Sequence, residues 1–166
     1  MINFFGNEEF RPLVRYGTVV PNYYVSRDGR LYSAKTNRFR KPVTNYYWTA
    51  TGEKKLRNQQ WILTFSDSNL FEDFNYSKKP GRNVHDINVK CHRAVAETWK
   101  PIDEFPPVPM EDWEKTPESV KELIRSTLVV DHIDDDPTNN HVDNLNWVIP
   151  KDNQHIRKKY KSMEES

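Results

Sequence analysis

Cysteine is nearly absent from this sequence of 166 residues, in which Cys91 stands alone. A single thiol excludes an internal disulfide and any zinc site built from several cysteines, and it favours a reducing compartment such as the cytoplasm. Long apolar runs are also lacking, so no segment reaches the ~20 residues that a membrane-spanning helix needs. The start, MINFFGNEEF, has no basic region ahead of its short apolar patch, so we expect no secretory signal.

Hydrophobic residues are scarce as well, at 36% of the chain, although aromatic residues reach 13%. The low apolar share predicts a small core and many loops. The aromatic rings provide apolar area to fill that core and argue against disorder. We therefore expect one folded domain of ordinary size, or one with a small appendage.

The net charge is only +1, yet the two signs are separated along the chain. Residues 1–100 carry a net charge of +8, residues 101–148 carry −9 and residues 149–166 carry +2. Such a chain can bind a polyanion with its basic part and hold a cation in its acidic part. An uneven surface charge without a ligand is the alternative.

The first hundred residues predict strands followed by one helix. Residues 18–33 indicate two short strands around Asp28-Gly29, a pair suited to a turn with positive φ. Three further strand candidates are residues 43–50, 60–65 and 84–90. A polar loop, TGEKKLRN, separates the first two of these three. Residues 91–99 then predict a helix, because apolar residues recur there at helical spacing.

The middle of the chain is rich in proline. Four prolines in residues 100–113 exclude a regular helix or a central strand and predict an extended connector. Thr116-Pro117-Glu118 then starts a helix, with a capping residue, an early proline and an acidic first turn. Its apolar stripe is expected to pack on the core and consists of Val120, Leu123 and Ile124.

The last third predicts the order strand, loop, strand, helix. The strands are 128–130 and 144–149, the loop between them is polar, and a helix follows Pro150 over residues 151–160. Asp131 and His132 stand together where the first strand ends. Because neighbours on a regular strand point to opposite faces, both can serve one site only if the strand ends or bulges there.

Two asparagines complete a pattern suited to cutting phosphodiester bonds. Asn144 follows His132 by 12 residues, and Asn153 follows it by 21. A histidine can take a proton from water, and a divalent cation can neutralise charge at phosphorus and on the leaving oxygen. If the final helix folds back over the strand end, Asp131 and Asn153 can share one ion, and so sparse a shell suits Mg²⁺.

The run LVVDHIDDDPTNNHVDNLNWVIPKDN resembles the ββα-metal motif of HNH endonucleases, in particular phage intron-encoded nicking homing endonucleases. The helix start HRAVA at residues 92–96 and the element NYYVSRDGRLYS at residues 22–33 are similar to further parts of these enzymes. The resemblance is weak over 17–65 and strong over 90–160. Asp134-Asp135-Asp136 departs from it, because the family has Asp-Gly-Asn there, and the 100–127 insert is longer and richer in proline.

The resemblance implies a role for each residue of the motif. Asp131 and Asn153 would be the metal ligands, His132 the general base, and Asn144 the catalytic-site asparagine that supports the loop and the histidine. It further implies one Mg²⁺ or Mn²⁺ ion per site and products with 5′-phosphate and 3′-hydroxyl ends. One active site per chain predicts nicking by a monomer, and a double-strand break needs a homodimer or two sequential events.

Basic residues cluster around the predicted hairpins, with tyrosines interleaved. A β-ribbon with basic edges can lie in a DNA groove, where positive charge supplies the salt-dependent part of the affinity. Ordinary solvated strands are the alternative. The candidates for DNA contact are Arg27, Arg30, Lys35, Arg38, Arg40, Lys41, Lys54, Lys55, Arg57 and, on the helical face of Asn153, Arg157.

Together these patterns predict an α+β protein with an N-terminal antiparallel β-rich DNA-binding region, residues 1–83. An HNH nuclease domain would follow over 84–166, with the proline-rich insert at 100–116. The expected function is a divalent-metal-dependent DNA endonuclease in the cytoplasm, that of the host cell if a phage encodes it. Its expected partner is double-stranded DNA, without a membrane. A catalytically inactive HNH-fold DNA-binding protein and an RNA-processing nuclease stay open as alternatives.

Overall fold

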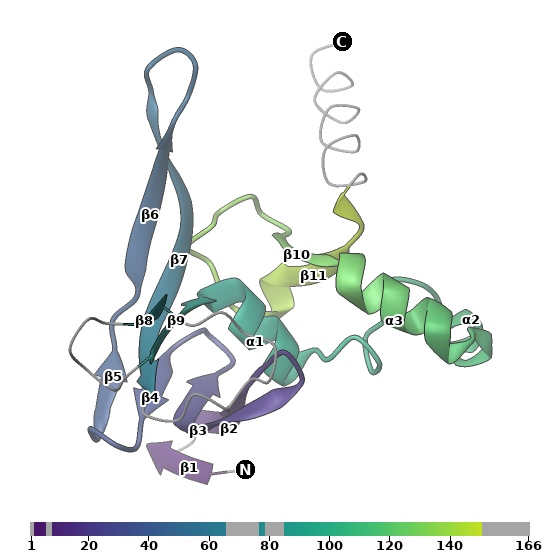
Figure 1. Ribbon diagram of the computed structural model, residues 1–166, viewed down its shortest axis with the longest axis horizontal. Helices are drawn as coiled ribbons and strands as arrows, with labels where there is room; N and C mark the ends of the chain where they lie inside the picture. The colour runs from purple at the N-terminus through teal and green to yellow at the C-terminus, as the bar shows by residue number, and fades with distance from the viewer. Residues whose placement is uncertain (1, 6–7, 66–76, 79–84, 151–166) are drawn as a thin grey trace.

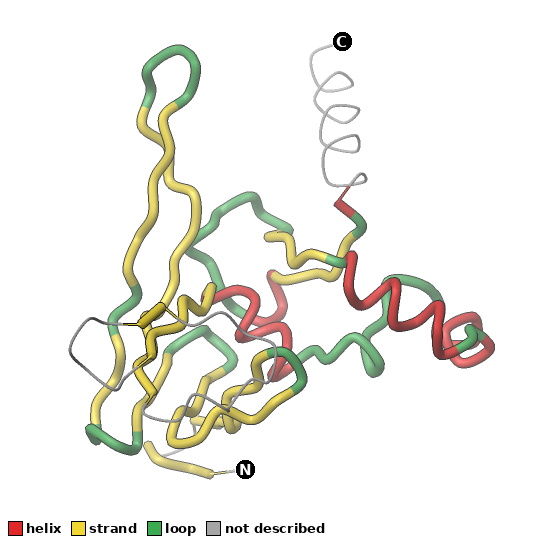
Figure 2. Tube along the Cα trace, in the orientation of Figure 1, coloured by secondary structure: helices red, strands yellow, loops and turns green. Residues whose placement is uncertain are grey.

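The computed structural model describes residues 2–5, 8–65, 77–78 and 85–150. Within these residues antiparallel sheets combine with three α-helices, which confirms the α+β class (Figure 1, Figure 2). None of the described helices is long and apolar enough to cross a membrane. The predicted boundary between residues 83 and 84 and the predicted helix 151–160 both touch residues outside this description, so they stay predictions.

The N-terminal sheet follows chain order and is antiparallel throughout. Its strands are β1 (Ile2–Phe5), β2 (Glu8–Arg15), β3 (Thr18–Ser26), β4 (Leu31–Ser33) and β5 (Arg38–Arg40). The predicted turn at Asp28-Gly29 is confirmed, because Gly29 has φ +82° and joins β3 to β4. The Ser26 hydroxyl accepts a hydrogen bond from the Arg30 N–H at 3.0 Å and donates to the Asp28 carboxylate, which closes the turn.

A second sheet carries a long two-stranded ribbon. Its strands are β6 (Val43–Trp48), β7 (Lys54–Phe65), β8 (Ser77–Lys78) and β9 (His85–Lys90), in the order β6-β7-β9-β8. The β6–β7 hairpin projects well beyond the rest of the molecule (Figure 1). The prediction of a polar loop over 51–58 was wrong for its second half, because Lys54–Asn58 pairs with β6 despite its polar composition.

A β-bulge lies in this ribbon beside Arg57. Tyr46 pairs with Leu56 and Asn45 pairs with Asn58, so Arg57 is the extra residue between two regular pairs. Cross-strand partners share a face of the sheet. The face that carries Asn45 therefore carries Asn58, and the amide nitrogen of Asn45 donates to Oδ1 of Asn58 at 2.9 Å. A bulge of this kind also changes the direction in which its own side chain points.

Helix α1 (Cys91–Trp99) lies at the centre and joins the two sheets to the C-terminal strands. It buries Ala94, Val95 and Trp99 in a core cluster that also holds side chains of β2, β3, β7, β9 and the C-terminal strands. Cys91 is buried at its first turn, and burial raises the pKa of the thiol. The helix and strand predicted around residue 90 are confirmed.

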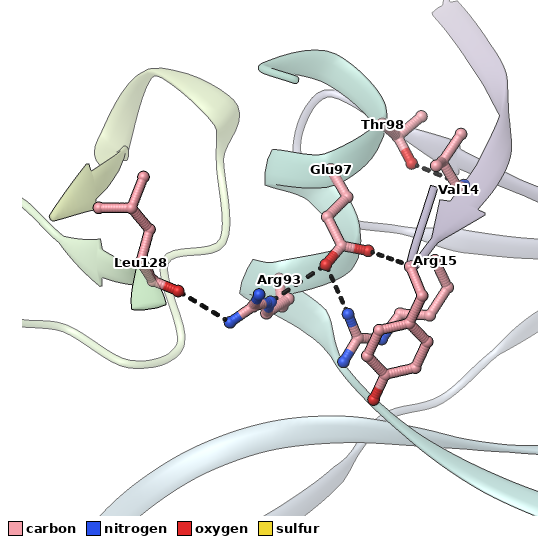
Figure 3. A network of polar contacts seen from close by, with 7 residues as sticks. Val14, Arg15, Arg93, Glu97, Thr98 and Leu128 are labelled. Carbon is pink, nitrogen blue, oxygen red and sulfur yellow. Dashed lines mark hydrogen bonds and ion pairs between the residues drawn. The ribbon is translucent and has the colours of Figure 1, made fainter. Parts of the chain in front are cut away.

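The carboxylate of Glu97 on α1 links the N-terminal sheet to the segment before the C-terminal strands. Glu97 accepts hydrogen bonds from Arg15 of β2, from the backbone N–H of Tyr16 and from Arg93 (Figure 3). Arg93 also donates to the backbone oxygen of Leu128 at 3.3 Å, just before the C-terminal strands. The Glu97 and Arg15 side chains are only 12% and 8% exposed, so this ion pair is largely shielded from solvent.

Residues 100–127 lead from α1 into an arm of two helices on one side of the molecule (Figure 1), and Ile102 and Ile124 in this range pack against the core. The prediction of an extended connector to residue 113 was wrong at its end, because α2 (Met110–Lys115) begins directly after Pro109. Helix α3 (Glu118–Thr127) confirms the predicted helix, with Pro117 as its capping residue. Arg125 holds the arm by ion pairs to Asp103 and Glu118.

The apolar stripe of α3 does not pack as predicted. Leu123 is 64% exposed, Val120 is exposed as well, and α3 buries none of its residues. Ile124 alone of the three packs partly against the core. The stripe was correctly identified as one helical face, but the position of the arm leaves most of that face without a protein partner among the described residues.

The C-terminal strands are β10 (Val129–His132) and β11 (Leu145–Val148), which pair antiparallel. Val130, Leu145 and Trp147 enter the core, where they pack with α1. A short 3₁₀ helix, η1 (Val142–Asn144), precedes β11, so Asn144 lies in that helix and the second predicted strand begins one residue later. The predicted order of strand, loop and strand is confirmed.

Candidate active site

Strand β10 ends at His132, with Asp131 directly before it. The backbone then turns away, and the Ile133 N–H donates to the Asn144 oxygen at 2.9 Å. Asp131 is half-buried, whereas His132 is only 9% exposed. Strand β10 ends at His132, although Asp131 and His132 still pair regularly with Asn146 and Leu145, and both residues line one cleft.

Asn144 organises the loop that follows. Its side-chain amide donates to Oδ1 of Asp134 at 2.8 Å and to the Asn139 oxygen at 2.9 Å. Its Oδ1 accepts from the Asp134 N–H at 3.2 Å. Hydrogen bonds from Asn139, from the Asp136 backbone and from Asn144 hold the pKa of Asp134 below its usual value. Asn144 thus supports the loop, and among the described residues no side-chain hydrogen bond joins it to His132.

Asp135 occupies the loop position where HNH endonucleases carry glycine. Its φ is +62°, in the left-handed region that favours glycine and that aspartate tolerates better than most residues. The departure from Asp-Gly-Asn therefore keeps the backbone turn and adds a carboxylate that lines the same cleft as Asp131.

His132 is held by a second asparagine in the same loop. Nε2 of His132 lies 3.1 Å from Oδ1 of Asn140, which is itself only 5% exposed. The amide nitrogen of Asn140 donates to Oε1 of Gln59, on β7, at 3.1 Å and to the backbone oxygen of Thr138 at 3.3 Å. A chain of hydrogen bonds therefore runs from the ribbon to the imidazole.

The β3–β4 turn packs against the loop that follows β10. A Cβ atom placed on Gly29 would lie 2.9 Å from Cβ of Asn140 and 3.2 Å from its backbone oxygen. The Val142 N–H donates to the Arg27 oxygen at 2.8 Å, so the same turn also holds the end of the loop. The element around residues 22–33 thus contributes to the position of the site.

His92, the second residue of α1, packs against His132. The two ring centroids are 5.1 Å apart, with the rings at 66° to each other. Burial, and then the positive charges of neighbouring groups, lower the pKa of His92 to about 3. His92 is therefore neutral at the pH values at which most enzymes work, and its uncharged ring packs beside the imidazole of His132.

These residues open onto a cleft of about 620 Å³ between the ribbon and β10. The ribbon contributes Tyr47, Lys55, Leu56, Arg57 and Asn58 to its lining. Lys90 and His92 come from the junction of β9 and α1, and Val130, Asp131, His132, Asp135 and Pro137 from β10 and its loop. Exposed cations thus share one cleft with two carboxylates and two imidazoles.

The other predicted DNA-contact residues lie outside this cleft. Lys54 stacks over the Tyr46 ring at 4.3 Å on the ribbon, and Arg40 donates to the Ile62 oxygen. Arg27 pairs with Asp143 at 3.4 Å, and Arg30 pairs with Asp28 at 2.9 Å. The remaining candidates on or beside β5 are exposed and are Lys35, Arg38 and Lys41. Arg157 lies outside the described residues.

Asp131 offers a metal ion one hard oxygen ligand at the cleft. Its predicted partner ligand, Asn153, lies outside the described residues. Within 2–5, 8–65, 77–78 and 85–150, no group of three or more His, Cys, Asp or Glu residues could hold an ion by itself. Such a donor set fits Mg²⁺, which keeps several waters and uses only one or two protein carboxylates together with phosphate oxygens.

Sequence reasoning missed several residues of this site. Lys90, Asn140 and Gln59 carried no recognised signal, although Asn140 stands within the motif itself. His92 stands in the run HRAVA, and nothing in that run predicted its contact with His132. Two asparagines four residues apart, at 140 and 144, look equivalent in sequence, and only the folded loop separates their partners.

Three comparisons place this chain among known proteins. A sequence profile described as HNH endonuclease matches residues 117–155. A solved structure of the HNH homing endonuclease I-HmuI, described for DNA binding and cleavage, has 22% sequence identity and a TM-score of 0.46. That similarity covers 92% of this chain but only 59% of the I-HmuI chain. No curated protein matches the sequence.

Proposed function

Because the chain carries a segment of the HNH endonuclease family at residues 117–155, we propose that it hydrolyses phosphodiester bonds of double-stranded DNA with a divalent metal ion. The observation that carries this proposal is the cleft of about 620 Å³, which Asp131 and His132 share with Lys55, Arg57 and Lys90. A DNA strand in that cleft meets cations that bind its phosphates and an imidazole that can accept a proton.

His132 is the general base of the proposed reaction. It takes a proton from the water that attacks phosphorus, so that a new P–O bond forms while the bond to the 3′ oxygen breaks. The products are a 5′-phosphate and a 3′-hydroxyl, whose oxygen is protonated from solvent. The neutral ring of His92 and the amide of Asn140 hold the imidazole while it gains charge.

Asp131 and Asn153 would hold one Mg²⁺ or Mn²⁺ ion. When bound, that ion neutralises charge on the phosphoryl group and on the leaving oxygen. Asp131 is placed for this by β10, which ends one residue later. Asp135 lines the same cleft and adds negative charge that favours a cation there.

The ribbon supplies the proposed DNA contacts. Lys55 and Arg57 are exposed and line the cleft together with Tyr47. Positively charged side chains that release counterions from DNA provide affinity without reading sequence. The single buried thiol fits a reducing cytoplasm, where we propose that the enzyme acts.

Supercoiled plasmid provides the test of this function. The protein is expected to convert it to open circles with Mg²⁺ or Mn²⁺, and EDTA is expected to stop the conversion. His132→Ala should bind DNA as the unchanged protein does and should lose at least ~100-fold in cleavage rate, the usual contribution of a general base. His141→Ala is the matched control, since His141 lies in the same loop and does not line the cleft.

The outcomes separate the alternatives. Binding without cleavage under every divalent metal would identify an inactive DNA-binding protein. Faster cleavage of RNA than of DNA in a competition assay would identify an RNA-processing nuclease. Open circles that accumulate before linear plasmid indicate nicking by a monomer, whereas simultaneous linear product indicates a dimer.

A further inference from the structure

Asn140 stands between the imidazole of His132 and the ribbon, and each end of its amide has its own partners. Oδ1 lies 3.1 Å from Nε2 of His132. Nδ2 lies 3.1 Å from Oε1 of Gln59 and 3.3 Å from the Thr138 oxygen. With 5% exposure, Asn140 has little water to replace a lost partner.

The chemistry of these partners fixes the direction of the amide. The backbone oxygen of Thr138 can only accept a hydrogen bond, so the atom that faces it must be the amide nitrogen. Oδ1 therefore faces His132 and must receive a proton from Nε2. A neutral imidazole carries one proton, so Nδ1 then holds the lone pair. Among the described residues, no hydrogen bond engages that Nδ1 atom.

We propose that Gln59 is a positioning residue for His132, which it reaches through Asn140. The inference rests on the proposed nuclease function in naming Nδ1 as the atom that takes the proton from water. Gln59 belongs to β7, directly after Arg57 and Asn58, which line the cleft. Its Oε1 gives Asn140 a second acceptor, and so keeps the amide from turning over.

Gln59 links the part of the ribbon that is expected to contact DNA to the tautomer of His132. The residues before it on β7 are those expected to meet phosphate, whereas its own side chain meets the loop of the active site. The ribbon that is expected to meet DNA therefore also holds the imidazole in the tautomer that the reaction uses. A ribbon displaced from the loop leaves the Asn140 amide with Thr138 as its acceptor.

Two substitutions of Gln59 distinguish this proposal from an effect of charge on DNA binding, because the two explanations predict opposite changes in cleavage rate. Gln59→Glu keeps an acceptor for Nδ2 of Asn140 and should retain most of the single-turnover cleavage rate. Gln59→Lys places a donor there, favours a reversed amide through a charge-assisted bond, and should lower that rate by ~10-fold or more. If Gln59 acted only through charge, lysine would aid DNA binding and cleavage, and glutamate would impair both.

Nitrogen-15 NMR of the imidazoles reports the tautomer directly, with neither DNA nor metal present. In its neutral form, His132 should show a proton on Nε2 in the unchanged protein and in Gln59→Glu. In Gln59→Lys the proton should move toward Nδ1. The matched controls are Gln60→Glu and Gln60→Lys, on the neighbouring residue of β7, and they should leave the His132 spectrum unchanged.

The cleavage rate and the NMR tautomer distinguish the positioning role of Gln59 from the proposed nuclease function. The expected tautomers without any cleavage would support the positioning role and refute the nuclease function. A Gln59→Lys protein that cleaves as fast as the unchanged protein, with its proton still on Nε2, overturns the positioning role. Should Gln59→Lys fail to fold, Gln59→Leu decides, because leucine offers Nδ2 of Asn140 no acceptor. His132 should then carry its proton on Nε2 less than in Gln59→Glu, and equal Nε2 protonation in both variants overturns the proposal.

Discussion

Gly29 and Asn140 lie so close that a methyl group on Gly29 would meet Cβ of Asn140 at 2.9 Å. These residues come from opposite ends of the chain, one in the β3–β4 turn and one in the loop after β10. Their contact means that the turn and the loop cannot move independently. Since Asn140 holds His132, the turn also contributes to the position of the proposed base.

Gly29→Ala should therefore cost more than the same change at Gly52. Both glycines have positive φ, +82° and +80°, but Gly52 has no atom within 4 Å of an added Cβ. A left-handed alanine alone costs ~1–2 kcal/mol. The close contact at Gly29 adds ~1–3 kcal/mol, the usual cost of overpacking. Urea unfolding of both variants measures the difference, and equal losses would show that the loop moves aside freely.

Asp131 and Asp135 both line the cleft, and the proposed metal ligand is Asp131. Asp131→Asn should lower the cleavage rate by ~100-fold or more, because a bound ion contributes several kcal/mol to the barrier. Asp135→Asn, which keeps a residue tolerant of positive φ, should lower it by less than about threefold. Cleavage rates over a Mg²⁺ titration measure both. A larger loss for Asp135→Asn would assign the ion to that residue instead.

His92 should make the protein less stable as the pH falls. In the unfolded chain its pKa is near 6.5, whereas burial lowers it to about 3 in the folded protein. Below pH 6.5 the unfolded chain therefore takes up a proton that the folded protein refuses. Its contribution is complete above pH 6.5 and is lost as the pH falls toward 3, at up to ~1.4 kcal/mol per pH unit.

His92→Phe removes this effect and keeps a ring against His132. The stability of the unchanged protein relative to His92→Phe should be constant above pH 6.5 and should fall below it. Chemical unfolding at a series of pH values gives this difference free of the carboxylates common to both proteins. Parallel pH profiles would mean that His92 takes up its proton in the folded state.

Lys55 and Arg57 should account for part of the salt dependence of DNA binding. Each phosphate contact contributes ~0.9 to the slope of log affinity against log salt concentration. Lys55→Ala and Arg57→Ala should each reduce that slope by about one such step, without changing the preferred sequence. Lys115→Ala on α2 is the control, since Lys115 is paired with Glu111 on the arm. A slope unchanged in both cleft variants would place the DNA elsewhere.

The sequence predicted the centre of the site better than its surroundings. The side-by-side Asp131 and His132 at a strand end follow from a short apolar strand and the motif around it. The partner of the imidazole did not follow. Whether Asn140 or Asn144 reaches His132 depends on the path of the loop, including the positive φ of Asp135, where glycine was the family residue.

Long-range pairing explains the other differences. Lys54–Asn58 has the composition of a loop, yet it continues β7 because β6 supplies its hydrogen-bond partners. The stripe of Val120, Leu123 and Ile124 indicates a helix with an apolar face, but periodicity says nothing about what covers that face. In both segments the local pattern was informative, and the outcome depended on residues distant in the chain.

The bulge at Arg57 means that this residue can be deleted without a shift of strand register. Leu56 and Asn58 each have a regular partner on β6, so Arg57 is an insertion between two regularly paired segments. Deletion of Arg57 would make the β6–β7 pairing continuous and remove one cation from the cleft, while Lys55 would stay on the same face of the ribbon. A chain without Arg57 would thus lose one cation of the cleft and keep the register of every other strand pair.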